Sequence, residues 1–116
     1  MKTRSFLKRL GFAVVGLQEG WRRERSFRTQ LLMGVLVVIG ILLLGASTAW
    51  MAIVALAIAV VLAAELFNSA LETLVDHLHP EIHAEIRVVK DMAAGAVLLV
   101  SIGASVVGLL FFFAQR

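Results

Sequence analysis

Four polar side chains follow one another along an otherwise apolar stretch of the sequence, and their types are those that bind metals and move protons. They are Glu65, Asn68, Glu72 and Asp76. At about 100° per residue these positions fall within roughly 80° of one another, so a helix would present their oxygen atoms in a single stripe. Residues 50–64, which precede the stripe, carry no charge. Because an ionised group beside hydrocarbon costs roughly 2.5 to 3.5 kcal/mol on insertion scales, we expect the stripe to face partners, water or a ligand.

The acidic side chains of the sequence could hold a divalent metal ion. Carboxylates that converge repel one another, and hard cations such as Mg²⁺ relieve this repulsion by taking oxygen ligands, usually together with substrate phosphates. Glu72 and Asp76 lie one helical turn apart, and Glu24 occurs in a basic segment expected near the same membrane interface. Lys90 could contact phosphate oxygens as a point charge. These residues therefore suit a site for a magnesium nucleotide.

Glu65 differs from the other acidic residues because it lies deepest in the apolar run. A carboxylate at that depth could act as the general base for a hydroxyl group that arrives from the bilayer. Asn68, which follows on the same face, could orient this base or the attacking oxygen.

The same residue types also have simpler explanations. Glu24 lies among arginines and could form only a surface ion pair. His77, His79 and His83 are better explained as histidines of a connecting loop than as metal ligands, because no second cluster of ligands accompanies them. Residues 90–91 could merely cap the last helix at the interface.

The composition is that of an integral membrane protein. Of the 116 residues, 60% are hydrophobic, whereas soluble domains contain roughly 45 to 50% apolar residues. We expect an all-α membrane protein with a single domain over residues 1–116, in which residues 30–116 form three transmembrane helices. Because three helices enclose little space, a homo-oligomer is expected. The absence of cysteine excludes disulfide bonds and thiolate sites.

The basic residues are concentrated in residues 1–30. Eight positive minus two negative side chains give this segment a net charge of +6, while three minus six give the remaining chain −3. Its apolar residues recur at spacings of three and four, at Phe6, Leu10, Ala13, Val14, Leu17 and Trp21. This spacing predicts an amphipathic helix within residues 1–29 that lies in the membrane interface, and a solvated basic face is the alternative.

Turn signals divide the remaining sequence into three spans. We expect them over residues 30–45, from residue 50 through the polar stripe, and over residues 92–114. Pro80 breaks the second helix and begins a polar connection that extends to residues 90–91. Since Lys and Arg crowd the N-terminal side, we expect the N-terminus and the 77–91 connection on the cytoplasmic side of a bacterial inner membrane.

A resemblance to a known family lies in residues 65–76, ELFNSALETLVD. They resemble the pattern E-x-x-N-[ST]-A-x-E-x-x-V-D of the small prokaryotic integral-membrane lipid kinases, which include bacterial diacylglycerol kinase and undecaprenol kinase. Residues 90–97, KDMAAGAV, are similar to a second motif of this family. The resemblance implies a homotrimer of three-span subunits, each with a further amphipathic helix, and active sites shared between subunits.

The resemblance also implies roles for individual residues. Glu65 would be the catalytic base and would lie with Asn68 at the lipid substrate. Glu24 and Glu72 would hold the Mg²⁺ that accompanies ATP. The residues implied in nucleotide binding are Arg9, Phe12, Glu24, Glu72, Asp76, Glu81, Ile82, His83, Lys90 and Asp91.

The sequence departs from the family pattern in two places. The nucleotide-contacting arginine of the family falls closest to Ser5, so Arg4 or Arg9 would take its place. Ala94 stands where the diacylglycerol enzyme has a serine, and residues 93–97 are more similar to the undecaprenol branch.

The predicted function is ATP-dependent phosphorylation of a membrane lipid hydroxyl group. Diacylglycerol, which gives phosphatidic acid, is the first candidate and undecaprenol the second. The expected partners are the lipid, ATP, the membrane and further copies of the chain, with no nucleic acid. A different class is a proton-coupled transporter or channel subunit, because an intramembrane Glu beside an Asn also occurs in proton relays. A relay needs such groups across the bilayer, and the first and third spans carry no charge at mid-depth.

Overall fold

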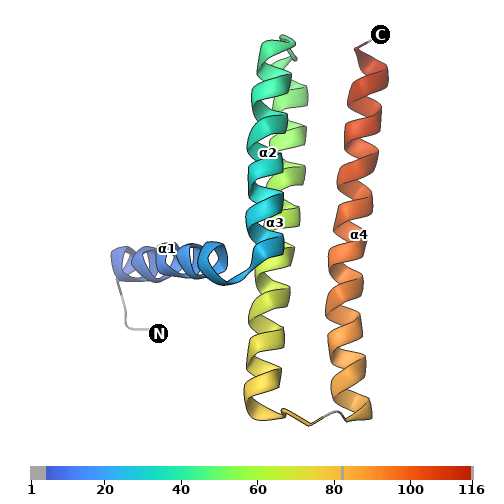
Figure 1. Ribbon diagram of the computed structural model, residues 1–116. Helices are drawn as coiled ribbons and strands as arrows, with labels where there is room; N and C mark the ends of the chain where they lie inside the picture. Colours follow the sequence, from blue (N-terminus) through green and yellow to red (C-terminus); the bar gives the residue numbers. More distant parts are fainter. Residues whose placement is uncertain (1–4, 82, 116) are drawn as a thin grey trace.

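Four α-helices form the computed structural model, which describes residues 5–81 and 83–115. They are α1 (Phe6–Arg23), α2 (Arg25–Leu43), α3 (Thr48–Leu78) and α4 (Ala84–Ala114). Helices α2, α3 and α4 extend along a common direction, and α1 projects from them nearly at a right angle (Figure 1). The described residues contain no strand, so the predicted all-α class is confirmed.

Helices α2, α3 and α4 are long and apolar enough to cross a membrane, as predicted. The 19 residues of α2 extend about 28 Å, close to the roughly 30 Å of a bilayer's hydrocarbon core. The 31 residues of α3 and of α4 extend about 46 Å. Both helices therefore continue beyond the part that a bilayer can cover. In Figure 1 these extensions lie beyond the level of α1, at the end where α3 and α4 are connected.

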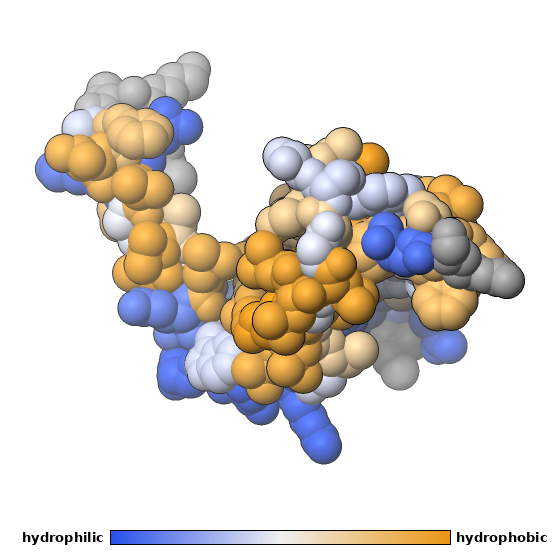
Figure 2. All heavy atoms as spheres, turned by 90° about the horizontal axis from the view of Figure 1, so that it is seen from above, coloured by the Kyte–Doolittle hydropathy of each residue, from blue (hydrophilic) through white to orange (hydrophobic). Residues whose placement is uncertain are grey.

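Helix α1 combines basic residues with an exposed apolar surface. It begins after Ser5, whose hydroxyl group accepts a hydrogen bond from the backbone N–H of Lys8 at 3.4 Å. Its large apolar side chains, among them Phe6, Leu10 and Trp21, are exposed, and Figure 2 shows them along the arm that α1 forms. A basic helix with such a surface is suited to the membrane interface.

Helices α2 and α3 approach each other closely at one glycine. A Cβ atom added to Gly34 of α2 would lie 2.8 Å from Cγ2 of Ile58 on α3. A larger residue would therefore force Ile58 or the helices to move. Gly20 near the end of α1 is buried and packs on Leu66 of α3, so α1 is anchored at the end that joins α2.

The opposite end of the three long helices contains a small apolar core. Ile41, Val54 and Phe111 are buried there, one from each helix. The rings of Trp50 and Phe111 meet edge to face, with their centroids 5.6 Å apart. Gly45, with a φ of +73°, makes the turn from α2 to α3, a conformation that favours glycine.

The start of α4 differs from the prediction. We expected a polar connection up to residues 90–91, whereas α4 begins at Ala84. Residues 84–91 contain no glycine or proline that would stop a helix. The side chain of His83 also caps the helix by accepting a hydrogen bond from the backbone N–H of Glu85 at 3.1 Å. Residues 90–91 therefore lie within the helix and do not cap it.

The start of α2 and the end of α3 can also be compared with the boundaries predicted from the sequence. Helix α2 begins at Arg25, more than one turn before the predicted start at Gln30, because its basic first residues continue the helix out of the apolar span. The predicted break at Pro80 is confirmed, since α3 ends at Leu78.

Candidate active site

The polar stripe lies on the half of α3 that leads to α4. Its four members are on one helix, as predicted, but they contact different parts of the molecule. Glu65 contacts α2, Asn68 contacts Glu72 of the same helix, and Asp76 contacts α4. The stripe therefore connects three helices at the end of the bundle that carries the α3–α4 connection.

Glu65 is held by two side chains of α2. The Nε2 atom of Gln30 donates a hydrogen bond to Oε1 of Glu65 at 2.8 Å. The Oγ atom of Ser26 donates to Oε2 at 3.4 Å. Ser26 and Gln30 are four residues apart and so share one face of α2. Glu65 and Gln30 are both half-buried, and the two contacts orient a carboxylate close to the junction of α1 and α2.

Sequence analysis did not identify Ser26 and Gln30 as site residues. It treated Gln30 only as the boundary of the first span. The available signal was the spacing of four between two polar side chains at the entry to an apolar helix. Nothing in the sequence shows that this face lies opposite Glu65, because the register between two helices depends on their packing.

An apolar groove of about 1100 Å³ is lined in part by Ser26 and Gln30, the two side chains that contact Glu65. Ser26 and Gln30 line one end of it and Phe111 lines the other. Among the described helices, α2 and α4 both pack against α3 but not against each other, so the groove follows α3 between them. The wall of the groove that α4 forms has few polar groups. One of them, the Ser105 hydroxyl group, donates a hydrogen bond to the backbone carbonyl of Ser101 at 2.9 Å, within the same helix. The groove could take a hydrocarbon chain whose polar end lies at Glu65.

Asn68 has one satisfied and one unsatisfied group. Its Nδ2 atom donates to Oε1 of Glu72 at 2.8 Å. Its Oδ1 atom is buried and has no hydrogen-bond partner within the described part of the chain. Because buried polar atoms in proteins are generally paired, this oxygen can accept a hydrogen bond from a ligand or from another subunit.

An ion pair between Asp76 and Lys90 joins the extended ends of α3 and α4. The ammonium group of a lysine has three donors, so Lys90 can bind a further anion while it contacts Asp76. Asp91 follows it on α4 and is exposed. Both charged residues lie within the first eight residues of α4, near the end that is connected to α3.

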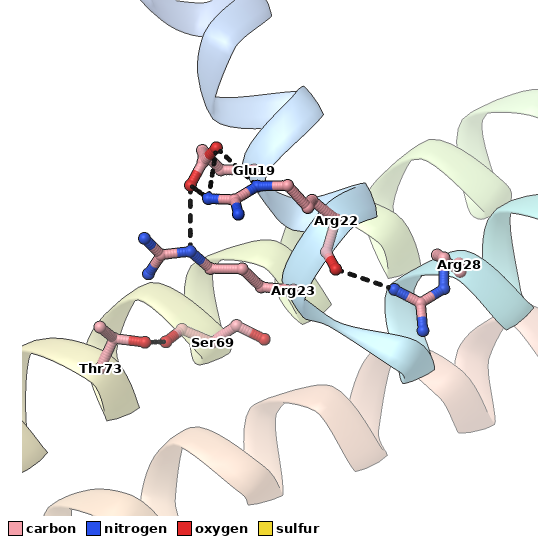
Figure 3. Close-up of polar contacts among 6 residues, drawn as sticks. All are labelled: Glu19, Arg22, Arg23, Arg28, Ser69 and Thr73. Carbon is pink, nitrogen blue, oxygen red and sulfur yellow. Dashed lines mark hydrogen bonds and ion pairs between the residues drawn. The ribbon is translucent and has the colours of Figure 1, made fainter.

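Glu24 lies half-buried at the junction of α1 and α2. The alternative of a surface ion pair does not hold for it, since no ion pair of Glu24 occurs within residues 5–81 and 83–115. The arginines instead contact Glu19, from Arg22 at 2.8 Å and from Arg23 at 3.0 Å (Figure 3). The hydrogen bond from Arg22 lowers the pKa of Glu19 below its usual value. The carboxylate of Glu24 is therefore left for another cation.

A second groove, of about 780 Å³, lies between α1 and α3. Its polar lining consists of Glu19, Arg23, Glu24, Ser69, Thr73 and His77. Figure 3 shows Arg23 over the turn of α3 in which Thr73 donates to the backbone carbonyl of Ser69. Glu24 thus faces the same half of α3 that carries Glu72.

Glu24 and Glu72 are not brought into one cluster: Glu24 lines the groove between α1 and α3, whereas Glu72 is not part of that lining and contacts Asn68. Within the described residues, no group of three or more His, Cys, Asp or Glu side chains is placed to hold a metal ion. A cation bound by Glu24 and Glu72 would therefore take its remaining ligands from a substrate, from water or from another subunit.

Two of the predicted nucleotide contacts lie far from the others. Arg9 and Phe12 are on the part of α1 that projects away from the bundle (Figures 1 and 2). Along the helix Arg9 is about 17 Å from Gly20, where α1 packs on α3. Helix α1 makes no close contact with α4 among the described elements, so one subunit does not bring Arg9 to Lys90.

The connection between α3 and α4 holds the remaining predicted contacts. Glu81 is exposed there, and His83 caps α4. Ile82 and Arg4, which the sequence analysis also named, lie outside the described residues.

Comparisons with known proteins identify the family of the chain. Residues 11–112 match the protein family described as prokaryotic diacylglycerol kinase. The chain is 37% identical to a diacylglycerol kinase of Synechocystis sp. over 98 residues, which cover 84% of this chain and 56% of that protein. It is 29% identical to a diacylglycerol kinase of Escherichia coli strain K12 over 93 residues, which cover 80% of this chain and 76% of that protein. The chain thus spans little more than half the length of the Synechocystis relative.

The match includes almost all of α1 to α4 and every residue of the polar stripe. Three helices that can cross a membrane agree with a membrane-bound enzyme. The chain therefore belongs to the prokaryotic diacylglycerol kinase family, a family of lipid kinases.

Proposed function

We propose that the chain transfers the γ-phosphoryl group of ATP to the hydroxyl group of a membrane lipid. One observation carries this proposal: Gln30 and Ser26, which hydrogen-bond to the Glu65 carboxylate, also line one end of an apolar groove along the three membrane-crossing helices. A lipid whose chain occupies this groove would present its hydroxyl group to a base. Membership of a lipid kinase family supports the same activity.

The described residues can perform the proton transfer and the binding that this reaction needs. Glu65 accepts the proton of the lipid hydroxyl group, whose oxygen attacks the γ-phosphorus in line while ADP leaves. The free Oδ1 atom of Asn68 can accept a hydrogen bond from the arriving lipid headgroup. Lys90, held by Asp76, places positive charge beside phosphate oxygens.

Glu24 and Glu72 would hold the Mg²⁺ that accompanies ATP. Carboxylate oxygens are the hard ligands that this ion takes in proteins, together with substrate phosphates, and the Glu24 carboxylate forms no ion pair with any of the described residues. When bound, the ion would neutralise the negative charge that develops on the phosphoryl oxygens.

Diacylglycerol is the lipid that we propose first, with phosphatidic acid as the product. The relatives in Synechocystis and E. coli are both named diacylglycerol kinases, which supports this choice. Undecaprenol is the alternative, because residues 93–97 resemble the undecaprenol branch of the family. Both lipids carry a primary hydroxyl group at the end of hydrocarbon, so the groove alone does not distinguish them.

We further propose a homotrimer with active sites at subunit boundaries, in a bacterial inner membrane with α1 and the α3–α4 connection in the cytoplasm. The excess of Lys and Arg in residues 1–30 supports this orientation. The projecting end of α1 with Arg9 supports the shared sites, because a neighbouring subunit would come within its reach.

The proposal is tested by offering both lipids to the purified protein in mixed micelles with labelled ATP. We expect labelled phosphatidic acid from diacylglycerol, loss of the label transfer on chelation of Mg²⁺, and recovery when Mg²⁺ is added back. Faster labelling of undecaprenol would make that lipid the substrate. Folded protein that labels neither lipid would contradict the proposed function.

A further inference from the structure

We propose that Gln30 is a positioning residue of this reaction, which holds one carboxylate oxygen of Glu65 so that the other oxygen faces the substrate hydroxyl group. The inference rests on the proposed function, because Gln30 acts only through the base. The two sequence motifs that resemble the family, residues 65–76 and 90–97, do not include Gln30.

The two oxygens of Glu65 are not equivalent in the structure. Oε1 accepts a hydrogen bond of ordinary length from Gln30, at 2.8 Å. Oε2 has only the long contact with the Ser26 hydroxyl group, at 3.4 Å, which is beyond the usual range of an O–H···O bond. Oε2 is therefore the oxygen that can take a proton from a substrate.

Packing of α2 on α3 fixes Gln30 opposite Glu65. Gly34 lies one turn after Gln30 on α2, and Ile58 lies seven residues, or two turns, before Glu65 on α3. A Cβ atom added to Gly34 would lie only 2.8 Å from Cγ2 of Ile58. This close approach sets both the spacing and the register of the two antiparallel helices. The hydrogen bond is thus a consequence of a rigid contact and not of a mobile surface side chain.

An oriented carboxylate favours the reaction because the proton and the phosphoryl group move together. The lipid O–H bond breaks as its proton passes to Oε2, the lipid oxygen bonds to the γ-phosphorus, and ADP leaves with the electron pair of the broken P–O bond. A carboxylate that rotates spends less time in the geometry that accepts the proton. Loss of the Gln30 donor should therefore lower kcat and leave the KM for ATP unchanged.

Three variants distinguish a positioning role of the Gln30 side chain from a role in packing alone. Gln30→Met keeps the length of the side chain and removes the donor, and Gln30→His keeps a nitrogen donor of similar reach. We expect kcat of Gln30→Met to fall about ten- to hundredfold, the range for a hydrogen bond to a charged group, and Gln30→His to retain most of the parent kcat. Gln18→Met is the matched control, because Gln18 is exposed on α1 and makes no hydrogen bond within the described residues.

Rates are measured in the same micelles with both lipids, together with the midpoint of thermal unfolding of each variant. If the parent labels no lipid, the proposed function is wrong and the role of Gln30 is lost with it. If the parent is active, three results overturn the inference alone. They are parent-like kcat in Gln30→Met, lower kcat in Gln30→His than in Gln30→Met, and a raised KM for ATP with unchanged kcat.

Discussion

Glu65 is a charged side chain in an apolar helix, and donors from α2 lie at both of its oxygens. A carboxylate that is removed from water needs such hydrogen bonds, because each missing partner leaves a desolvation cost. Ser26 and Gln30 therefore make it possible to keep this charge beside the apolar groove.

The first prediction is that Glu65→Gln abolishes phosphoryl transfer. The substitution is nearly isosteric and removes the proton acceptor, so kcat should fall by the roughly 10²- to 10⁴-fold that a general base contributes. Binding of Mg-ATP and the oligomeric state should remain as in the parent. Turnover in mixed micelles, calorimetric titration with Mg-ATP and size-exclusion chromatography measure the three properties. Parent-like turnover in this variant would remove Glu65 from the mechanism.

Glu24 and Glu72 are expected to act together on the metal nucleotide. Glu24→Ala or Glu72→Ala should weaken binding of Mg-ATP, because each removes one hard oxygen ligand. Glu85→Ala is the control, since Glu85 is exposed in the first turn of α4 and has no proposed role. Calorimetric titration at fixed ionic strength measures the dissociation constants. The assignment of the metal ligands is wrong if Glu24→Ala and Glu72→Ala bind Mg-ATP as tightly as Glu85→Ala does.

At the scale of helices, the site depends on how closely α2 packs on α3. Gly34 allows the approach to Ile58, and one turn earlier on α2 the same face presents Gln30 to Glu65. Helix α4 instead joins α3 through the Asp76–Lys90 pair near their connection and through apolar packing at Phe111. Helix α3 is thus the common element on which α1, α2 and α4 all pack.

Gly34→Val should destabilise the protein and lower its activity. The added methyl groups overlap Ile58, and overpacking of this kind costs about 1 to 3 kcal/mol. Gly40→Val on the same helix is the matched control, because an added Cβ atom at Gly40 meets nothing within 4 Å. Thermal unfolding in detergent and turnover measure the two effects. Equal losses in both variants would show that the effect belongs to valine in the helix and not to the contact with Ile58.

The helices themselves could be predicted from the sequence, whereas the contacts between them could not. Apolar runs of about 20 residues identify the spans, and the spacing of the acidic residues places them on one face of α3. The start of α4 was missed because the charged residues among 84–91, which follow Pro80, were interpreted as part of a polar connection. The cap also comes from His83, an unusual capping residue. Gln30 was missed because its role depends on a register that Gly34 and Ile58 set across two helices.

At the scale of the whole molecule, helix α1 projects away from the other helices, which gives the chain an open shape (Figure 2). Most of its large apolar side chains are exposed, as expected for helices whose surfaces face lipid. Asp76 and Lys90 meet within one chain, whereas the two described helices that Glu24 joins have no close contact with the helix of Lys90. Glu24 lies where α1 joins α2, and Lys90 lies on α4, which contacts only α3 among the described helices.

We therefore predict that mixed subunits restore activity. Glu24→Ala and Lys90→Met should each be strongly impaired alone, because one loses a metal ligand and the other a phosphate contact. When the two variants are unfolded, mixed and reassembled, some sites should collect a wild-type Glu24 from one subunit and a wild-type Lys90 from another. Turnover of the mixture, compared with each variant reassembled alone, measures the restoration. A mixture with no more activity than its components would mean that each subunit contains a complete site.

Helix α2 gives the molecule a preferred membrane thickness. It is the shortest of the crossing helices, with 19 residues, and it is fixed at one end by α1 and at the other by the tight turn at Gly45. Helices α3 and α4 have length to spare, so hydrophobic mismatch acts on α2, which responds to a thinner bilayer by tilting. Tilting moves Gln30 relative to Glu65, and the alignment of the base then changes with the lipid around it. The activity of the enzyme should therefore change with the thickness of the hydrocarbon core of the bilayer, which lipids of different chain length can test.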